Sequence, residues 1–150
     1  MTTAALTIEQ LLAMLPHRYP MLLIDRVLEL SADHVVAIKN VAIDEPWVAA
    51  HVPGLPIMPA VLQLEAMAQA GVLLATHAAA LDPAVEVIAL LAIDAARFRR
   101  PVAPGDQLHV AVRATRKGSL LALAGEIRVD GAVASTAKLV VGRVARAKLA

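Results

Sequence analysis

From residue 86 onward, hydrophobic and polar residues follow the two-residue period of strands with one buried face. Turn signals separate these runs at Pro104–Asp106, Lys117-Gly118 and Asp130-Gly131. Asp-Gly favours a tight hairpin, because both central residues of such a turn need a positive φ. The pattern therefore predicts a meander of strands over Glu86–Asp94, Gln107–Lys117, Ser119–Val129 and Ala132–Val144, with a frayed C-terminus after it.

The first part of the chain combines one short helical signal with two strand-like runs. Thr7 is a suitable N-cap, and Gln10 three residues later completes a capping box, which predicts a helix over Thr7–Leu15. After it, the pattern predicts strands over Leu22–Leu30 and His34–Ile43, a turn at Ser31–Asp33 between them, and a loop rich in proline over Asp44–Pro59.

The most apolar segment begins at Pro59, and proline is favoured at the first helical position because its missing N–H would be unpaired there. Apolar residues occupy nearly every side of this helix as far as Leu81, so we expect it to be central and buried. Its polar residues Glu65, Gln69 and Thr76 are spaced by four and seven and share one face. Together these elements predict an α+β fold in which a long antiparallel sheet wraps one buried helix.

Composition points to a subunit interface and away from nucleic acid. The 150 residues, the length of one ordinary domain, are 59% hydrophobic with a mean hydropathy of +0.66, which indicates buried surface beyond that of a monomer. The net charge is +1, and the sequence has one Trp, one Tyr and one Phe, so the basic surface and stacking rings of nucleic-acid-binding proteins are missing. Without cysteine, the chain forms no disulfide and no thiolate metal site.

Membrane and export signals are also weak. The N-terminal residues lack a basic stretch followed by an apolar core, so we expect no signal peptide. The longest apolar run, residues 66–81, contains Gln69 and His77 and is shorter than the roughly 20 residues that span a bilayer. We therefore expect a cytoplasmic protein without a membrane span.

Candidate chemistry gathers where the proline-rich loop meets the helix. Ala60 is the first non-proline residue of the helix, and its N–H lacks an intrahelical acceptor, so it can polarise a carbonyl oxygen. His51 can exchange a proton near neutral pH, and Glu65, if held away from water, can keep a proton and donate it. Converging in one pocket, these groups suit proton removal beside a carbonyl with loss or gain of water. The alternative is structural: a packed loop histidine and a glutamate that interacts with the helix dipole.

No metal or cofactor is expected. No two histidines stand at metal-ligand spacing, and the chain has neither a phosphate-binding glycine loop nor a serine in a nucleophile elbow. The histidines other than His51 are expected to be structural or exposed.

Three blocks of sequence resemble, in order and spacing, the bacterial 3-hydroxyacyl-[acyl-carrier-protein] dehydratases of the FabZ type. They are LPHRYPMLLIDRVLEL (15–30), IKNVAIDEPWVAAHVPGLPIMPAVLQLEAMAQAG (38–71) and IDAARFRRPVAPGDQL (93–108). The resemblance implies the hotdog fold and a cofactor-independent hydro-lyase of fatty acid biosynthesis. Such an enzyme converts a (3R)-hydroxyacyl thioester on acyl carrier protein to the trans-2-enoyl thioester.

The resemblance also implies a role for each matching residue. His51 corresponds to the base that removes the α-proton, Glu65 to the acid that protonates the departing hydroxyl, and Ala60 to a glycine whose N–H binds the thioester oxygen. In the family the histidine and the acid of one site come from different subunits of a homodimer, and hexamers built as trimers of dimers are common. Val52, and the pair Trp47-Val48, replace phenylalanines of the family pattern.

Two further sets of residues are expected around the substrate. An apolar tunnel beside the helix would be lined by Val52, Met58, Val61 and Ile93, and an acidic carrier protein would dock on Arg97, Arg99 and Arg100. Three alternatives keep the fold but change the function: a hotdog acyl thioesterase, a divergent dehydratase of a secondary or polyketide-like pathway, and a non-catalytic acyl-binding subunit. The presence of both His51 and Glu65 favours dehydration over hydrolysis and over simple binding.

Overall fold

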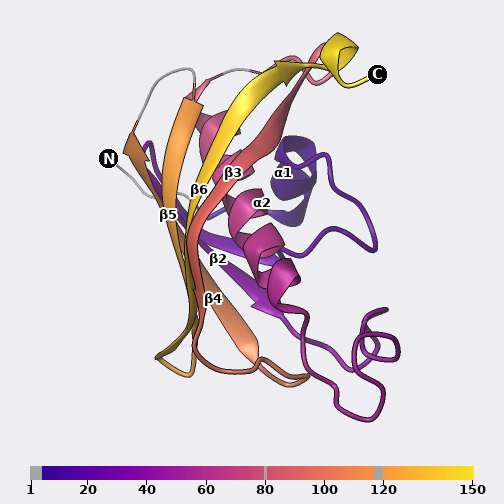
Figure 1. Ribbon diagram of the computed structural model, residues 1–150. Helices are drawn as coiled ribbons and strands as arrows, with labels where there is room; N and C mark the ends of the chain where they lie inside the picture. The colour runs from indigo at the N-terminus through magenta and orange to yellow at the C-terminus, as the bar shows by residue number, and fades with distance from the viewer. Residues whose placement is uncertain (1–4, 80, 117–119) are drawn as a thin grey trace.

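In the computed structural model, which describes residues 5–79, 81–116 and 120–150, an antiparallel sheet wraps a long helix (Figure 1). The six strands of this sheet follow the spatial order β1-β2-β4-β5-β6-β3. They are β1 Arg26–Leu30, β2 His34–Asn40, β3 Glu86–Phe98, β4 Gln107–Arg116, β5 Leu120–Val129 and β6 Ala132–Ala145. The long helix is α2, Ala60–Ala78, and the shorter α1, Ile8–Met14, packs on it. The predicted α+β architecture is therefore confirmed.

Local turn and capping signals gave the correct structure. Thr7 is the N-cap of α1: its hydroxyl accepts the Gln10 N–H at 3.3 Å, and the Gln10 side chain accepts the Thr7 N–H at 2.9 Å. Asp130 and Gly131 have φ of +50° and +79° and join β5 to β6 in a tight turn. Both predictions are confirmed.

Strand β1 is shorter than predicted, because the residues before it contact α2. The prediction began at Leu22, but Leu23 and Ile24 are buried and Leu23 donates its N–H to the Gln69 side chain at 2.9 Å. Strand pairing starts only at Arg26, opposite Ile38. The second predicted strand also ends early, at residue 40 instead of 43.

Strand β3 is longer than predicted. It continues past Asp94 to Phe98 through a bulge at Ala95, which has a φ of +49° and shifts the register against β6. Helix α2 begins one residue after Pro59, which is its N-cap, and ends at Ala78, not Leu81. The C-terminal residues expected to fray form a short 3-10 helix over Arg146–Lys148. The predicted strand ends Lys117 and Ser119 lie outside the described residues.

Two glycines allow α2 to approach the sheet closely. A Cβ on Gly125 of β5 would lie 2.7 Å from the Met67 sulfur and 3.1 Å from its Cγ, and one on Gly71 would collide with the Leu123 side chain. Met67 and Leu123 are themselves buried in the core between helix and sheet. Because glycine has no side chain, these two positions set the distance between α2 and the sheet.

We predict that Gly125→Ala lowers the free energy of unfolding by about 1–3 kcal/mol, the usual cost of overpacking a core. In a Met67→Ala background, which leaves space at this point, the same substitution should cost clearly less. Urea denaturation of the four proteins measures both effects. An unchanged midpoint for Gly125→Ala in the wild-type background would contradict the close approach.

Candidate active site

The loop between β2 and α2 is held by a carboxylate that connects it to the sheet. Glu45 Oε1 accepts from Lys39 Nζ at 2.9 Å and from the Ala42 N–H at 3.0 Å, and its Oε2 accepts from the Trp47 indole at 2.8 Å. Lys39 is only 5% exposed, so this pairing offsets the cost of burying its charge. The Trp47 carbonyl in turn accepts the His51 N–H at 2.8 Å. Sequence reasoning missed this network, because neither its burial nor its pairing has a local signature.

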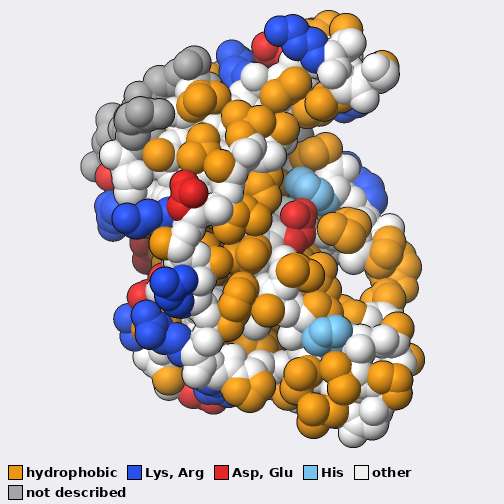
Figure 2. All heavy atoms as spheres, in the orientation of Figure 1, with side chains coloured by type: hydrophobic (Ala, Val, Ile, Leu, Met, Phe, Trp, Pro, Cys, Tyr) orange, Lys and Arg blue, Asp and Glu red, His pale blue; other side chains and the backbone are white. Residues whose placement is uncertain are grey.

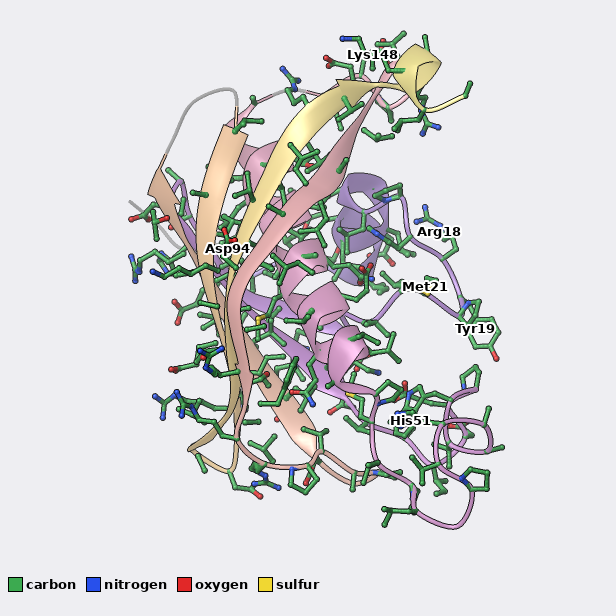
Figure 3. The ribbon with its side chains drawn as sticks, in the orientation of Figure 1. Arg18, Tyr19, Met21, His51, Asp94 and Lys148 are labelled. Atoms are coloured by element: carbon green, nitrogen blue, oxygen red, sulfur yellow. The ribbon has the colours of Figure 1, made fainter. Side chains whose placement is uncertain are left out.

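His51 itself is oriented by its other ring nitrogen. Its Nδ1 lies 2.9 Å from the Ile57 carbonyl oxygen. Since a carbonyl only accepts, the neutral ring carries its hydrogen on Nδ1 and has a lone pair on Nε2, as a base requires. Figure 3 shows His51 in the loop beside the N-terminal end of α2.

His51 opens into a hollow of about 380 Å³ between this loop, the start of α2 and the segment after β3. Its lining residues are His51, Ile57, Met58, Ala60, Gln63, Phe98, Arg99, Arg100 and Pro101. The structure therefore brings the predicted base His51 and the predicted oxyanion donor Ala60 to one hollow, together with Met58. Arg99 and Arg100 also line it, and Arg100 lies 3.5 Å from Asp106.

Glu65 does not line this hollow. Five residues along an α-helix correspond to a rotation of about 140°, so Glu65 and Ala60 lie on nearly opposite sides of α2. The side chain of Glu65 is 24% exposed and faces His17, which precedes β1. Glu65 is thus only partly buried, not buried as the apolar helix predicted, and within one chain it does not share the hollow of His51 and Ala60.

The Glu65 carboxylate is held through one of its oxygens. Its Oε1 accepts from Gln69 Nε2 at 2.8 Å and lies 3.4 Å from His17 Nε2. Gln69 is fully buried, and it also donates to the Met21 carbonyl at 2.6 Å and accepts the Leu23 N–H. Among the described residues none bonds Oε2, so that oxygen is available to carry a proton.

His17 is a neighbour of Glu65 that sequence reasoning placed among the structural or exposed histidines. Burial lowers its pKa, the charge of Glu65 opposes this effect, and the pKa remains below its ordinary value. The ring is therefore neutral near pH 7, and its buried Nδ1 has no hydrogen-bond partner in the part of the chain that the structure describes. A hydrogen on Nε2, where Glu65 can accept it, avoids a buried unpaired N–H. One sequence feature could have drawn attention to His17: it lies in the segment PHRYP, within the first of the three blocks that resemble the dehydratase family.

The other residues expected at a substrate tunnel or docking surface do not gather at the hollow. Val61 is 68% exposed on α2, Ile93 is 45% exposed on β3, and Val52 is half-buried in the loop. Arg97 donates to the neighbouring Ala96 carbonyl. These four residues do not line the hollow in a single chain.

Within residues 5–79, 81–116 and 120–150, no group of three or more His, Asp or Glu side chains is placed to hold a metal ion. Over the same ranges, no helix is long and apolar enough to cross a membrane.

Comparison with known proteins identifies the family. Residues 15–138 match the model of the FabA-like domain, and the chain belongs to this family. It is 45% identical over 137 residues to the 3-hydroxyacyl-[acyl-carrier-protein] dehydratase FabZ of Solibacter usitatus, covering 91% of this chain and 84% of that protein. It is 47% identical to the FabZ of Shewanella frigidimarina over 91% of both chains.

Solved structures show the same fold. The dehydratase heterocomplex ApeI:P of Xenorhabdus doucetiae superposes with a TM-score of 0.79 at 24% identity, over 93% of both chains. A hot-dog-like protein of Thermanaerovibrio acidaminovorans superposes with a TM-score of 0.63 at 19% identity, over 77% of this chain and 84% of that one. The predicted hotdog fold is thereby confirmed.

The Glu45 network makes the stability of the protein depend on pH. Burial alone raises the pKa of Glu45, but hydrogen bonds from Lys39, the Ala42 N–H and the Trp47 indole outweigh it and hold the pKa below its ordinary value. A depressed pKa in the folded state means that the unfolded chain binds the proton first on acidification. The contribution of Glu45 is thus complete near neutral pH and is lost as the pH falls through the folded pKa.

We predict that Glu45→Gln lowers the unfolding free energy at pH 7 by about 1–3 kcal/mol, the range for hydrogen bonds to charged groups. The difference from wild type should shrink between about pH 5 and pH 3. Denaturant titrations at several pH values measure it. Glu126→Gln, which breaks only a surface pair with Arg128, serves as the control and should change stability by less than about 1 kcal/mol. A difference for Glu45→Gln that is constant over this pH range would contradict the interpretation.

Proposed function

We propose that this chain is a 3-hydroxyacyl-[acyl-carrier-protein] dehydratase of fatty acid biosynthesis. The observation that carries the proposal is the hollow lined by both His51, whose Nδ1 lies beside the Ile57 carbonyl, and Ala60 at the N-terminal end of α2. Proteins named as this dehydratase, with about the same length as this chain and 45–47% identity to it, support the same activity.

The geometry suggests how the reaction proceeds. Ala60 N–H binds the thioester oxygen, where negative charge develops when a proton leaves C2. His51 Nε2 takes that proton, and the electrons of the C–H bond form the C2–C3 double bond. The C3–O bond breaks, and its oxygen takes the proton of Glu65 Oε2 and leaves as water. No cofactor is needed, because the thioester itself acidifies C2–H.

The acid comes from a second copy of the chain in this proposal. Strand β3 is a sheet edge of 13 residues and exposes Leu90, Leu91, Ile93 and Phe98, which an isolated soluble protein would not leave uncovered. Figure 2 shows a band of hydrophobic side chains along the face that β3 and α2 share. A homodimer formed through this face would bring Glu65 of one chain to the hollow of the other, and three dimers would form a hexamer.

The remaining parts of the proposal concern the substrate. Val52, Met58, Val61 and Ile93 would line the acyl tunnel once the dimer forms, and Arg97, Arg99 and Arg100 would dock the acidic carrier protein in the cytoplasm. Thioester hydrolysis is less well supported. A thioesterase of Pseudomonas aeruginosa shares the fold with a TM-score of 0.69, but it is only 17% identical to this chain.

The test is water addition to a crotonyl thioester, the reverse reaction, followed by loss of enoyl absorbance. Wild type should catalyse it, and His51→Ala should reduce turnover by about 10²–10⁴, the usual contribution of a positioned acid or base. His109→Ala, at an exposed position on β4, is the control and should retain full turnover. Release of free thiol without hydration would instead indicate a thioesterase, and near-normal turnover of His51→Ala would exclude the role of His51.

A further inference from the structure

Gln63 is a buried amide whose oxygen is unpaired. The residue is 2% exposed, and none of the residues that the structure describes forms a hydrogen bond with its Oε1. Its neighbours on the same turn of α2, Leu64, Ala66 and Met67, are buried hydrophobic residues. A buried amide without partners destabilises a fold relative to an apolar side chain of the same size. Packing therefore gives no reason for glutamine at this position.

A second glutamine on the same helix shows the contrast. Gln69 is also buried, and its amide is used fully: it binds Glu65, Met21 and Leu23 through three hydrogen bonds. The hydrogen bonds of the Gln69 amide are thus satisfied within the chain, whereas the Gln63 oxygen has no partner among the described residues. A bound ligand that carries a hydrogen-bond donor would supply the partner that Gln63 lacks among the described residues.

The position of Gln63 identifies that ligand. It follows Ala60 by three residues on one face of α2, and both line the hollow that contains His51. The Gln63 side chain therefore lies in the wall of the hollow that also contains the proposed base and the proposed oxyanion donor. Within the proposed function, these atoms are C1 to C3 of a 3-hydroxyacyl thioester.

Hydrogen-bonding chemistry then selects one atom of the substrate. An amide oxygen only accepts, and the one hydrogen-bond donor on C1 to C3 is the hydroxyl on C3. The thioester oxygen is an acceptor and is already assigned to Ala60 N–H. We propose that Gln63 is a further substrate-binding residue, whose Oε1 accepts a hydrogen bond from the 3-hydroxyl group. This inference rests on the proposed dehydratase function.

The contact has a clear consequence for the reaction. With its own hydrogen directed to Gln63, the hydroxyl oxygen presents a lone pair to the incoming proton of Glu65. When the C3–O bond breaks, the oxygen has gained that proton and kept its original one, so water leaves still bound to Gln63. Gln63 neither gains nor loses a proton. It binds substrates that carry the 3-hydroxyl and does not contact saturated acyl thioesters.

The test compares Gln63→Met, which keeps a long unbranched side chain but loses the acceptor, with wild type. Leu64→Met, at the adjacent buried position, is the matched control for introducing methionine at this turn. Dehydration of a 3-hydroxybutyryl thioester and competitive inhibition by the butyryl thioester, which lacks the hydroxyl, are measured with the thermal midpoint. If Gln63→Met fails to fold, Gln63→Leu replaces it.

We expect kcat/KM of Gln63→Met for the hydroxyacyl substrate to fall by about 10- to 100-fold, the loss of one substrate hydrogen bond from a buried acceptor. Inhibition by the butyryl thioester should change less than about twofold, and the thermal midpoint should stay equal or rise. Activity then falls without any loss of stability, which a purely structural role does not produce.

Four results would overturn the inference. Unchanged kcat/KM in Gln63→Met would mean that a buried water satisfies the amide. Equal weakening of substrate turnover and butyryl inhibition would mean that Gln63 only shapes the pocket, as would an equal loss in Leu64→Met. A wild-type protein without dehydratase activity would remove the proposed function, and the inference with it, whereas an active wild type whose kcat/KM is matched by Gln63→Met would remove the inference alone.

Discussion

The need to cover helix α2 on every side determines the rest of this structure. Its residues from Ala66 to Leu74 are buried without interruption, so the helix has no solvent face along this stretch. The sheet covers one side at a distance set by Gly71 and Gly125. The segment before β1 covers another side of α2, and Gln69 holds it there through hydrogen bonds to the backbone of Met21 and Leu23. Burial of one apolar helix thus organises sheet, loop and N-terminal segment together.

The same helix separates the chemical groups of the site. Its first turn presents Ala60 and Gln63 to the hollow of His51, whereas Glu65 faces His17 about 140° further around the axis. One chain therefore carries the proposed base and the proposed oxyanion donor on one side of α2 and the proposed acid on the other. Two chains joined along β3 would complete two sites, which accounts for the apolar edge strand and for the hydrophobic excess of the sequence.

Local rules predicted most of the fold, and interactions distant in sequence explain the failures. The Thr7 capping box and the Asp130-Gly131 turn are decided by a few adjacent residues. The bulge at Ala95 had no signal, because alanine is not typical of a positive φ. For the candidate site, residue types pointed to His51, Ala60 and Glu65 but gave no sign of the hydrogen-bonding residues around them, whose roles depend on burial. These residues are His17, Lys39 and Gln69. The spacing of five between residues 60 and 65 already places the two on nearly opposite sides of a helix.

The central claim is that an active site draws His51 from one chain and Glu65 from another. His51→Ala and Glu65→Ala, each inactive alone, can be unfolded together in equal amounts and refolded. About half of the dimers would then be mixed, and each mixed dimer would hold one intact site and one site that lacks both groups. The mixture should recover about a quarter of wild-type turnover. A mixture as inactive as its parents, beside a wild-type sample that regains activity after the same treatment, would contradict the claim.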